Sequence, residues 1–377
     1  MRRTNSSAHN ASGSAGSLYI HVPFCEAKCV YCAFASAIKS PGDEELYLAS
    51  LEREAALRSE EAGTLDTVYI GGGTPTALSE RAWERLTETL ERHFDFANDA
   101  EFTVEANPNS LTRDHIGIWR NYRVNRVSIG VQSLTDSRLA YLGRIHTAMQ
   151  AQSAVARSLD AGFSVSADMM FGLPDETIRD WGRDLKSAVA LGTRHISIYQ
   201  LTMEPGTPLA ARDTALPDGY AQYRYAQWRL PRHGLAQYEV ASFARAGYES
   251  RHNLNYWSDG EYLGLGPSAW SYVGGARSKN APTLAEYARM LESGSPEIYS
   301  ERLEGEAAAR QAAVLALRTA GGVDREKFAD RYGEEHARAI MRDIAGFPGD
   351  LVDMDAKSVR LTAKGLRVGN AIWNEIV

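Results

Sequence analysis

The chain contains 377 residues, 44% hydrophobic and 24% charged, and its 41 Lys and Arg against 48 Asp and Glu leave a formal net charge of −7. This is the composition of a globular protein and excludes a disordered or fibrous chain, while the acidic balance argues against nucleic acid as a partner. No stretch approaches the roughly 18 apolar residues that a membrane span requires, so we expect a soluble protein with a sizeable core.

The first 17 residues, MRRTNSSAHNASGSAGS, are predicted to form a disordered polar tail. They contain two arginines and no acidic residue, but they lack the apolar stretch of a secretory signal. A transit peptide is the alternative that composition leaves open.

Short β-branched or apolar runs alternate with longer amphipathic stretches over the first 200 residues or so. The runs that predict strands are Leu18–Val22, Thr67–Ile70, Phe102–Val104, Arg126–Val131, Phe163–Met170 and His195–Tyr199. The stretches that predict helices between them are residues 43–62, 79–93, 147–161 and 178–191. Strands separated by helices indicate βαβ units and a parallel sheet. We therefore predict an α/β fold, a partial (β/α)6 barrel.

All three cysteines of the chain, Cys25, Cys29 and Cys32, follow the first predicted strand within eight residues. An odd, tight set is a poor disulfide framework and indicates a metal or redox site in a reducing compartment, hence a cytoplasmic protein. Three thiolates suit a four-iron cluster with one iron left open to another ligand. Structural zinc with His21 as the fourth ligand and reduced structural cysteines are the alternatives.

Polar or unusual residues also end the other predicted strands. The GGGTP segment, residues 71–75, follows the second strand, and Glu105, Gln132 and Asp168 end the next three. The carboxyl ends of parallel β/α strands lie on one face, where such proteins carry their chemistry. We expect these residues to form a single site with the cysteines.

The pattern changes after residue 210. Residues 221–238 predict an aromatic-rich helix, YEVASFA a seventh strand, and Gly260–Lys279 an irregular loop. Residues 306–332 predict helices, and the final segment predicts a hairpin followed by a helix, as in a small winged-helix-like module. The expected units are a tail (1–17), a barrel (18–210), a barrel extension (211–300) and a C-terminal winged-helix-like domain (301–377).

The spacing Cys25-x3-Cys29-x2-Cys32, with Tyr31 before the last cysteine, resembles the signature of the radical S-adenosylmethionine (SAM) superfamily. The resemblance implies that the three thiolates hold a [4Fe-4S] cluster, whose unique iron binds the amino and carboxylate groups of SAM. The resemblance also implies that GGGTP corresponds to the family's GGE-like element, whose backbone contacts the methionine part of SAM. It implies that Arg144 forms an ion pair with the carboxylate of SAM. The cofactor-binding residues it implies are Tyr19, Tyr31, Phe34, Gly72, Gly73, Thr74, Glu105, Gln132, Arg144 and Asp168.

Further segments narrow the resemblance to one branch of the superfamily. YIHVPFC, EANP, RVSIGVQS, LGRIH and MFGLP are similar to the oxygen-independent coproporphyrinogen III oxidases and their relatives, from about Leu18 to the end of the chain. Decarboxylases of this branch have a further cysteine where this chain has Phe34. The segment HNLNYW instead resembles the HNxxYW motif of a haem chaperone family within the branch, which binds haem and delivers it to apoproteins.

The HNxxYW residues suit haem on chemical grounds. His252 is a candidate axial ligand, Asn253 could orient its ring, and Tyr256 and Trp257 offer flat apolar surface. The alternative is a structural histidine with aromatic residues of the core.

The resemblance predicts a cytoplasmic haem chaperone that uses the cluster and SAM and carries haem as cargo. Its partners would be recipient haemoproteins, with respiratory enzymes at the membrane among the candidates, and a dimer is one oligomeric state open to it. SAM cleavage would be regulatory or absent, and no catalytic residue is assigned. The alternative is a radical SAM enzyme that acts on a porphyrin, as in coproporphyrinogen III decarboxylation, and a third class is a zinc-stabilised structural protein.

Overall fold

A computed structural model describes residues 14–212 and 214–377 of the chain. Most of the expected polar tail, residues 1–13, therefore lies outside the described residues. The last three residues of that segment, Ala15 to Ser17, already belong to the first strand, which begins three residues earlier than predicted.

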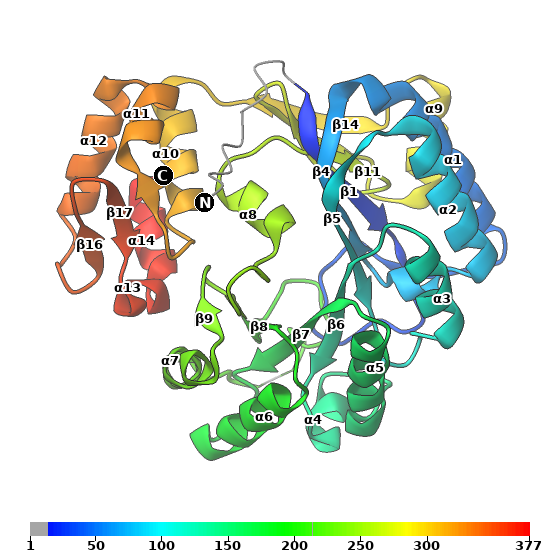
Figure 1. The fold of residues 1–377 in the computed structure, drawn as a ribbon, viewed down its shortest axis with the longest axis horizontal. Helices are drawn as coiled ribbons and strands as arrows, with labels where there is room; N and C mark the ends of the chain where they lie inside the picture. Colours follow the sequence, from blue (N-terminus) through cyan, green and yellow to red (C-terminus); the bar gives the residue numbers. More distant parts are fainter. Residues whose placement is uncertain (1–13, 213) are drawn as a thin grey trace, which may run out of the picture.

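The core of the fold is a curved sheet of nine strands in the order β11-β1-β4-β5-β6-β7-β8-β10-β9 (Figure 1). Its six central strands are parallel and confirm the six predicted runs. These strands are β1 (Ala15–Val22), β4 (Ala62–Gly72), β5 (Phe96–Ala106), β6 (Arg126–Gln132), β7 (Ser164–Phe171) and β8 (His195–Gln200). They form the predicted partial barrel, with all six carboxyl ends on one side.

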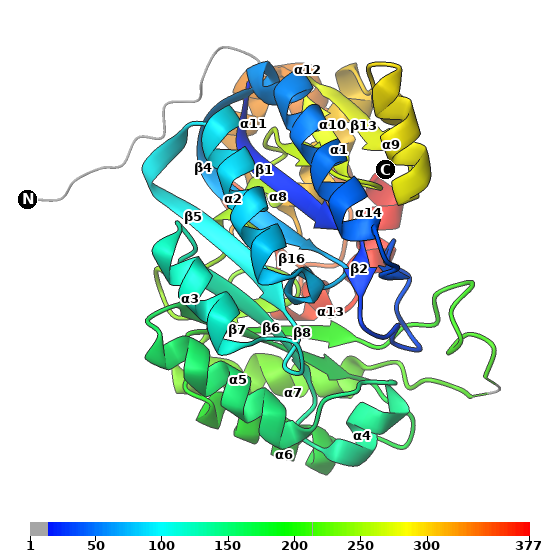
Figure 2. The same cartoon turned by 90° about the vertical axis from the view of Figure 1, so that its right-hand side faces the viewer.

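Helices cover the outer face of the sheet (Figures 1 and 2). They are α1 (Asp43–Arg58), α2 (Glu80–His93), α3 (Arg113–Asn121), α4 (Asp136–Tyr141), α5 (Ala148–Asp160) and α6 (Ile178–Ala190). The hydroxyls of Ser79, Thr112, Thr147 and Thr177 cap four of these helices by accepting backbone N–H groups of the first turn. The helices α3 and α4 were not predicted, because each is too short to show a clear helical period.

Three fully buried tryptophans pack these helices onto the strands. Trp83 of α2 meets Trp119 of α3 edge to face at 5.3 Å between ring centroids, and Trp181 of α6 packs on Phe171 of β7. Such aromatic contacts bury large apolar areas. The packing holds the strand ends, and the loops that follow them, in place.

The barrel extension departs from the prediction. Residues 260–279, predicted as an irregular loop, contain β11 (Leu263–Leu265), β12 (Trp270–Val273) and β13 (Ala276–Asn280). Strand β11 adds to the edge of the barrel parallel to β1, and β12 and β13 form a separate sheet with β14 (Glu297–Arg302). The close approach of β11 to β12 requires glycine at position 264, because a Cβ there would lie 1.9 Å from the carbonyl oxygen of Trp270.

The predicted seventh strand is also different from expectation. Of YEVASFA only Ser242–Ala244 forms a strand, β10, which runs antiparallel to β8 and pairs with the two-residue β9 (Ala236–Gln237). It closes the edge of the sheet and adds no further β/α unit. The remaining elements of this region are α7 (Tyr220–Arg229), η3 (Leu230–His233), α8 (Arg251–Trp257) and α9 (Leu284–Glu292).

The C-terminal part forms a group of helices closed by a small sheet, as predicted, and lies beside α8 (Figure 1). Its sheet has the order β15-β17-β16, and chain order is helix, strand, two helices, hairpin and two helices. The elements are α10 (Gly305–Ala316), β15 (Val323–Asp324), α11 (Arg325–Tyr332), α12 (Glu334–Ala345), β16 (Val352–Met354), β17 (Ser358–Leu361), α13 (Ala363–Arg367) and α14 (Gly369–Ile376).

A buried carboxylate ties the extension to the barrel. Glu54 of α1 is fully buried and accepts hydrogen bonds from the backbone N–H of Gly266 at 2.8 Å, Asn280 Nδ2 at 2.7 Å and Tyr287 Oη at 2.5 Å. Arg58 Nη1 lies 3.5 Å from the same carboxylate. Three donors from the extension and one from α1 therefore surround this single carboxylate.

No helix among the described residues is long and apolar enough to cross a membrane.

Candidate functional site

A cavity of about 320 Å³ opens at the carboxyl ends of the barrel strands. All three cysteines line it, as do all the cofactor-binding residues expected from the sequence except Tyr19. Figure 2 shows β2 (Phe24–Cys25), which starts the cysteine loop, at the end of the barrel towards which the strand arrows point. The structure thus brings residues from five strand ends and one loop into a single site, as the sequence predicted.

The cysteine loop runs along one wall of this cavity. Cys25, Cys29 and Cys32 are half-buried and are not joined in disulfides. Thr74 Oγ1 donates to Cys25 Sγ at 3.4 Å and Arg144 Nη1 donates to Cys29 Sγ at 3.5 Å. A hydroxyl and a guanidinium therefore lie within hydrogen-bond distance of two of the three sulfur atoms.

The donor set fits an iron–sulfur cluster better than zinc. His21, the expected fourth zinc ligand, is buried, and its Nε2 meets the carbonyl oxygen of Ala35 at 2.7 Å while its Nδ1 meets Tyr19 Oη at 3.0 Å. Neither nitrogen is free. No three His, Cys, Asp or Glu side chains among residues 14–212 and 214–377 converge on one point suitable for a single metal ion. A cluster of several irons needs no such convergence, since each thiolate binds a different iron.

The glycine segment lies directly against the cysteine loop. The backbone N–H of Gly73 donates to the carbonyl of Val22 at 2.8 Å, and that of Thr74 donates to the carbonyl of Phe24 at 2.6 Å. A Cβ on Gly73 would lie 2.6 Å from the oxygen of Phe24, so only glycine allows this approach. The segment is held where its backbone faces the cavity.

Two carboxylates stand at the bottom of the cavity. Glu105 accepts from Tyr69 Oη at 2.7 Å and from the N–H of Gly72 at 3.1 Å, and burial raises its pKa to about 7. Asp168 accepts from Ser128 Oγ at 2.9 Å, and burial raises its pKa as well. Both groups are poised to accept hydrogen bonds from a polar or cationic ligand.

Gln132 carries an unusual backbone and an unpaired oxygen. Its φ is +62°, a left-handed conformation that non-glycine residues seldom adopt, and the β6–β7 register shifts just before it. Its Oε1 is buried without a hydrogen-bond partner. Buried polar atoms normally have partners, so this oxygen favours a cavity built around a polar ligand.

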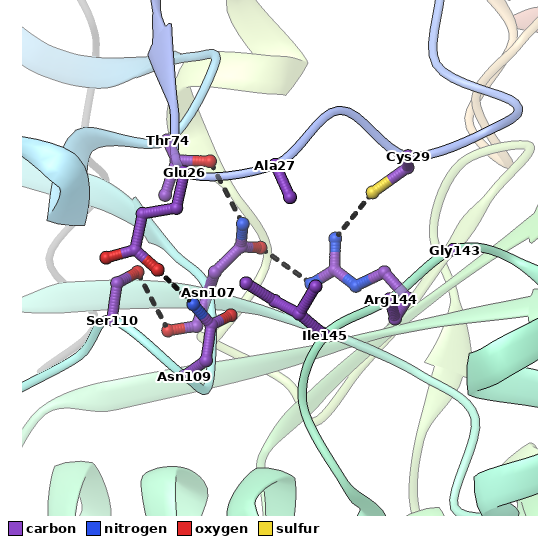
Figure 3. A pocket seen from close by; sticks show the side chains of 10 residues that line it. All are labelled: Glu26, Ala27, Cys29, Thr74, Asn107, Asn109, Ser110, Gly143, Arg144 and Ile145. Atoms are coloured by element: carbon purple, nitrogen blue, oxygen red, sulfur yellow. Dashed lines mark hydrogen bonds between the residues drawn. The ribbon is translucent and has the colours of Figure 1, made fainter. Parts of the chain in front are cut away.

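Arg144 lies beside the cysteine loop and is fixed there by several hydrogen bonds (Figure 3). Its Nη2 donates to Asn107 Oδ1 at 2.6 Å and to the carbonyl of Gly130 at 2.8 Å, while Asn107 Nδ2 donates to Thr74 Oγ1 at 2.9 Å. The sequence interpretation did not single out Asn107, although it lies in the EANP segment two residues after Glu105. Asn107 joins the guanidinium to the glycine segment and fixes both.

Two of the expected cofactor residues lie at the edges of the site. Phe34 lines the cavity mouth and is 66% exposed, so it offers an apolar rim where the decarboxylase branch has a cysteine. Tyr19 lies beneath the cavity, where its ring stacks on Tyr69 at 6.3 Å between centroids. Its contact with the site is therefore indirect.

The HNxxYW residues do not share one surface. His252 is fully buried in the barrel, with Nδ1 2.8 Å from Thr67 Oγ1 and Nε2 2.8 Å from Tyr256 Oη. Trp257 lines a separate groove of about 920 Å³, the α8 groove, formed by residues of α8, α10 and α11 and by the start of β1 and the middle of β4. Haem binding by these residues stays a prediction, and an axial role for His252 Nε2 would require its hydrogen bond with Tyr256 Oη to break.

Known proteins resemble this chain in sequence and in fold. A model of the Radical SAM superfamily matches residues 19–188. The chain is 34% identical to the heme chaperone HemW of Bacillus subtilis over 95% of this chain and 98% of that relative. It is 38% identical to the heme chaperone HemW of Escherichia coli, over 68% of this chain and 70% of that one. The radical SAM enzyme coproporphyrinogen III oxidase (HemN) of E. coli shares the fold, with a TM-score of 0.85 at 23% identity over 97% of this chain and 91% of that chain.

Proposed function

The chain belongs to the HemW family of the radical SAM superfamily, and from this premise we propose that it is a haem chaperone that binds haem and transfers it to recipient haemoproteins. The observation that carries the proposal is the cavity in which the cysteine loop, the glycine segment and the buried carboxylates meet. Phe34 in place of the further cysteine supports a chaperone over a decarboxylase.

In this proposal Cys25, Cys29 and Cys32 hold a [4Fe-4S] cluster, and SAM occupies the cavity beside it. Arg144 receives the SAM carboxylate, Glu105 accepts from the amino group, and the remaining strand-end residues, Gln132 and Asp168, serve as further acceptors. When bound and reduced, such a cluster can supply an electron to SAM. The chain's own residues bind and orient the two groups and screen them from water.

The proposed acceptor role of Glu105 predicts a pH-dependent affinity for SAM. Because the carboxylate is the better acceptor for the amino group, protonation of Glu105 below a pKa of about 7 contributes about a tenfold loss of affinity between pH 8 and pH 6, in addition to the effect of the ligand's own amino group. The groups that face Glu105 are Tyr19, Tyr69, Arg126, Asp168, Tyr199 and Tyr256. Equilibrium dialysis of SAM with cluster-loaded protein across this range measures the effect.

The matched variant is Glu105→Gln, which keeps the shape of the side chain but cannot titrate. It is expected to bind SAM more weakly at pH 8 and to show a smaller change in affinity between pH 8 and pH 6 than wild type, because only the contribution of the ligand's own amino group remains. Equal pH profiles in wild type and variant would contradict the assignment.

The proposed recipients are haemoproteins, including respiratory enzymes of the membrane, which a chaperone in the cytoplasm would meet at the membrane periphery. A dimer is the proposed assembly. The names of the relatives support haem as the cargo.

A radical SAM enzyme acting on a porphyrin is the second candidate. Its supporting observation is that the cavity is complete: every expected strand-end acceptor lines it, together with Arg144. An enzyme of this kind would need a porphyrinogen seated at the exposed rim formed by Phe34.

Haem titration distinguishes the two. Cluster-loaded protein, titrated anaerobically and followed by visible absorption, is expected to bind haem saturably at about one per chain. Trp257→Ala is expected to weaken binding by about tenfold or more, since the ring lines the α8 groove and large aromatic contacts are worth one to several kcal/mol. The matched control is Trp228→Ala, which removes a half-exposed tryptophan on α7. Non-saturable binding by wild type would overturn the chaperone proposal, and SAM-dependent porphyrinogen decarboxylation would then be measured.

A further inference from the structure

The helix that carries the HNxxYW motif is fixed to the inside of the barrel. Glu101 of β5 accepts from the backbone N–H of Arg251 at 2.9 Å and from that of His252 at 3.0 Å, at the first turn of α8. Ser250 caps the helix by accepting from the N–H of Asn253. A carboxylate at a helix N-terminus stabilises the helix, so the backbone of His252 has one defined position.

Both ring nitrogens of His252 are engaged in hydrogen bonds inside the protein. Thr67 Oγ1 donates its proton to Ser17 Oγ at 2.8 Å, so the 2.8 Å contact with His252 Nδ1 requires that Nδ1 be the donor. Nε2 then accepts from Tyr256 Oη. Burial lowers the pKa of His252 to about 3, which keeps the ring neutral at physiological pH. The ring is therefore a fixed, neutral, internally bonded group.

This ring packs against a residue that holds the SAM cavity. The rings of His252 and Tyr69 are stacked, with centroids 5.2 Å apart and planes at 28°. Tyr69 Oη in turn donates to Glu105 Oε1 at 2.7 Å, and the ring of Tyr69 also stacks on that of Tyr19. Two contacts thus connect His252 with the carboxylate at the bottom of the cavity.

We propose that His252 is a positioning residue of the SAM site, which acts through Tyr69 to hold Glu105 in place, and that it does not bind haem iron. The inference rests on the proposed function in so far as it needs SAM in the cavity. Under this proposal the motif has two parts. His252 and Tyr256 bond to each other inside the barrel, and Trp257 faces the α8 groove.

The test compares His252→Ala with His252→Phe in cluster-loaded, full-length protein. Alanine removes the stacked ring, and we expect at least a fivefold loss of SAM affinity by equilibrium dialysis. Phenylalanine restores an aromatic surface against Tyr69 and is expected to recover most of that affinity. Since phenylalanine cannot coordinate iron, an unchanged haem affinity in His252→Phe, measured by visible absorption, is the second expected result.

The pH profile of SAM binding distinguishes a specific role of His252 in positioning Glu105 from a general loosening of the structure in the variant. The hydrogen bond from Tyr69 lowers the pKa of Glu105, so its loss in His252→Ala should move the midpoint of the profile to higher pH. A loosened structure would weaken binding at all pH values without moving the midpoint. Trp228→Ala, on α7 and outside this network, should leave both the midpoint and the haem affinity near wild type.

The outcomes keep this inference apart from the proposed function. Loss of haem affinity in His252→Phe with SAM affinity intact would make His252 a haem ligand and overturn the inference. Unchanged SAM affinity and midpoint in His252→Ala would also overturn it, as would absence of SAM binding by wild type. Failure of wild type to bind haem, with the SAM results as expected, would overturn only the chaperone proposal.

Discussion

Replacing Cys25, Cys29 and Cys32 together by alanine is expected to abolish iron and sulfide binding. The chain has no other cysteine, and four-iron clusters are held by cysteine thiolates, so the carboxylates that remain in the cavity are not expected to replace them. Wild type reconstituted without oxygen should contain about four irons per chain, and the variant almost none. Iron and sulfide analysis with visible absorption measures the change.

SAM affinity should fall with the cluster, because the open iron would be one of the anchors of SAM. The variant should keep the unfolding midpoint of apo wild type, since the cysteines are half-buried and outside the apolar core. A wild type that retained one zinc and no iron would contradict the cluster assignment. His21→Ala would then show whether zinc depends on that ring, whose nitrogens the structure places in hydrogen bonds with Tyr19 and Ala35.

Glu54→Ala is expected to cause the largest loss of stability of any single substitution considered. The change leaves Tyr287 and the N–H of Gly266 without their acceptor, leaves Asn280 Nδ2 with only the carbonyl of Gly266, and leaves Arg58 without one of its carboxylates. Removing one partner from a buried charged network costs about 3–5 kcal/mol. Urea unfolding followed by tryptophan fluorescence measures the free energy of unfolding.

Two variants test the origin of that loss. Glu54→Gln keeps the side-chain volume but has one acceptor oxygen in place of two, so an intermediate loss is expected. Glu88→Ala, at an exposed position on α2, should change stability by less than about 0.5 kcal/mol. A loss in Glu54→Ala no larger than in Glu88→Ala would show that the network adds nothing to stability.

The barrel could be predicted because its strands are buried parallel strands with a strong local signal. Runs such as Arg126–Val131 and His195–Tyr199 reappear as β6 and β8 within a residue at each end. The candidate site followed from the same signal. Once the strand ends are known, the geometry of a parallel barrel brings Glu105, Gln132 and Asp168 together with the cysteine loop.

The extension could not be predicted because its strands depend on partners far away in the chain. Residues 260–279 are rich in Gly, Tyr and Trp, which locally indicates a loop. Their strand structure comes from the free edge of β1 and from Glu54, about 200 residues earlier. The motif HNLNYW likewise shows no sign of which helix face turns inward, and only the fold reveals that His252 and Trp257 point to different places.

Helix α8 is only seven residues long, yet it lines the α8 groove and also packs against Tyr69 beneath the strand-end cavity. Its His252 side supports the SAM cavity through Tyr69, and its Trp257 side contacts Arg318, whose guanidinium also stacks on Trp373 of α14 at 4.2 Å. Under the proposed role of His252, a ligand in the α8 groove that moves this helix is expected to change the affinity for SAM. By thermodynamic reciprocity, SAM then changes the affinity of the groove for its ligand by the same factor. Cargo held there would be retained or released according to the occupancy of the cofactor, with no cofactor consumed.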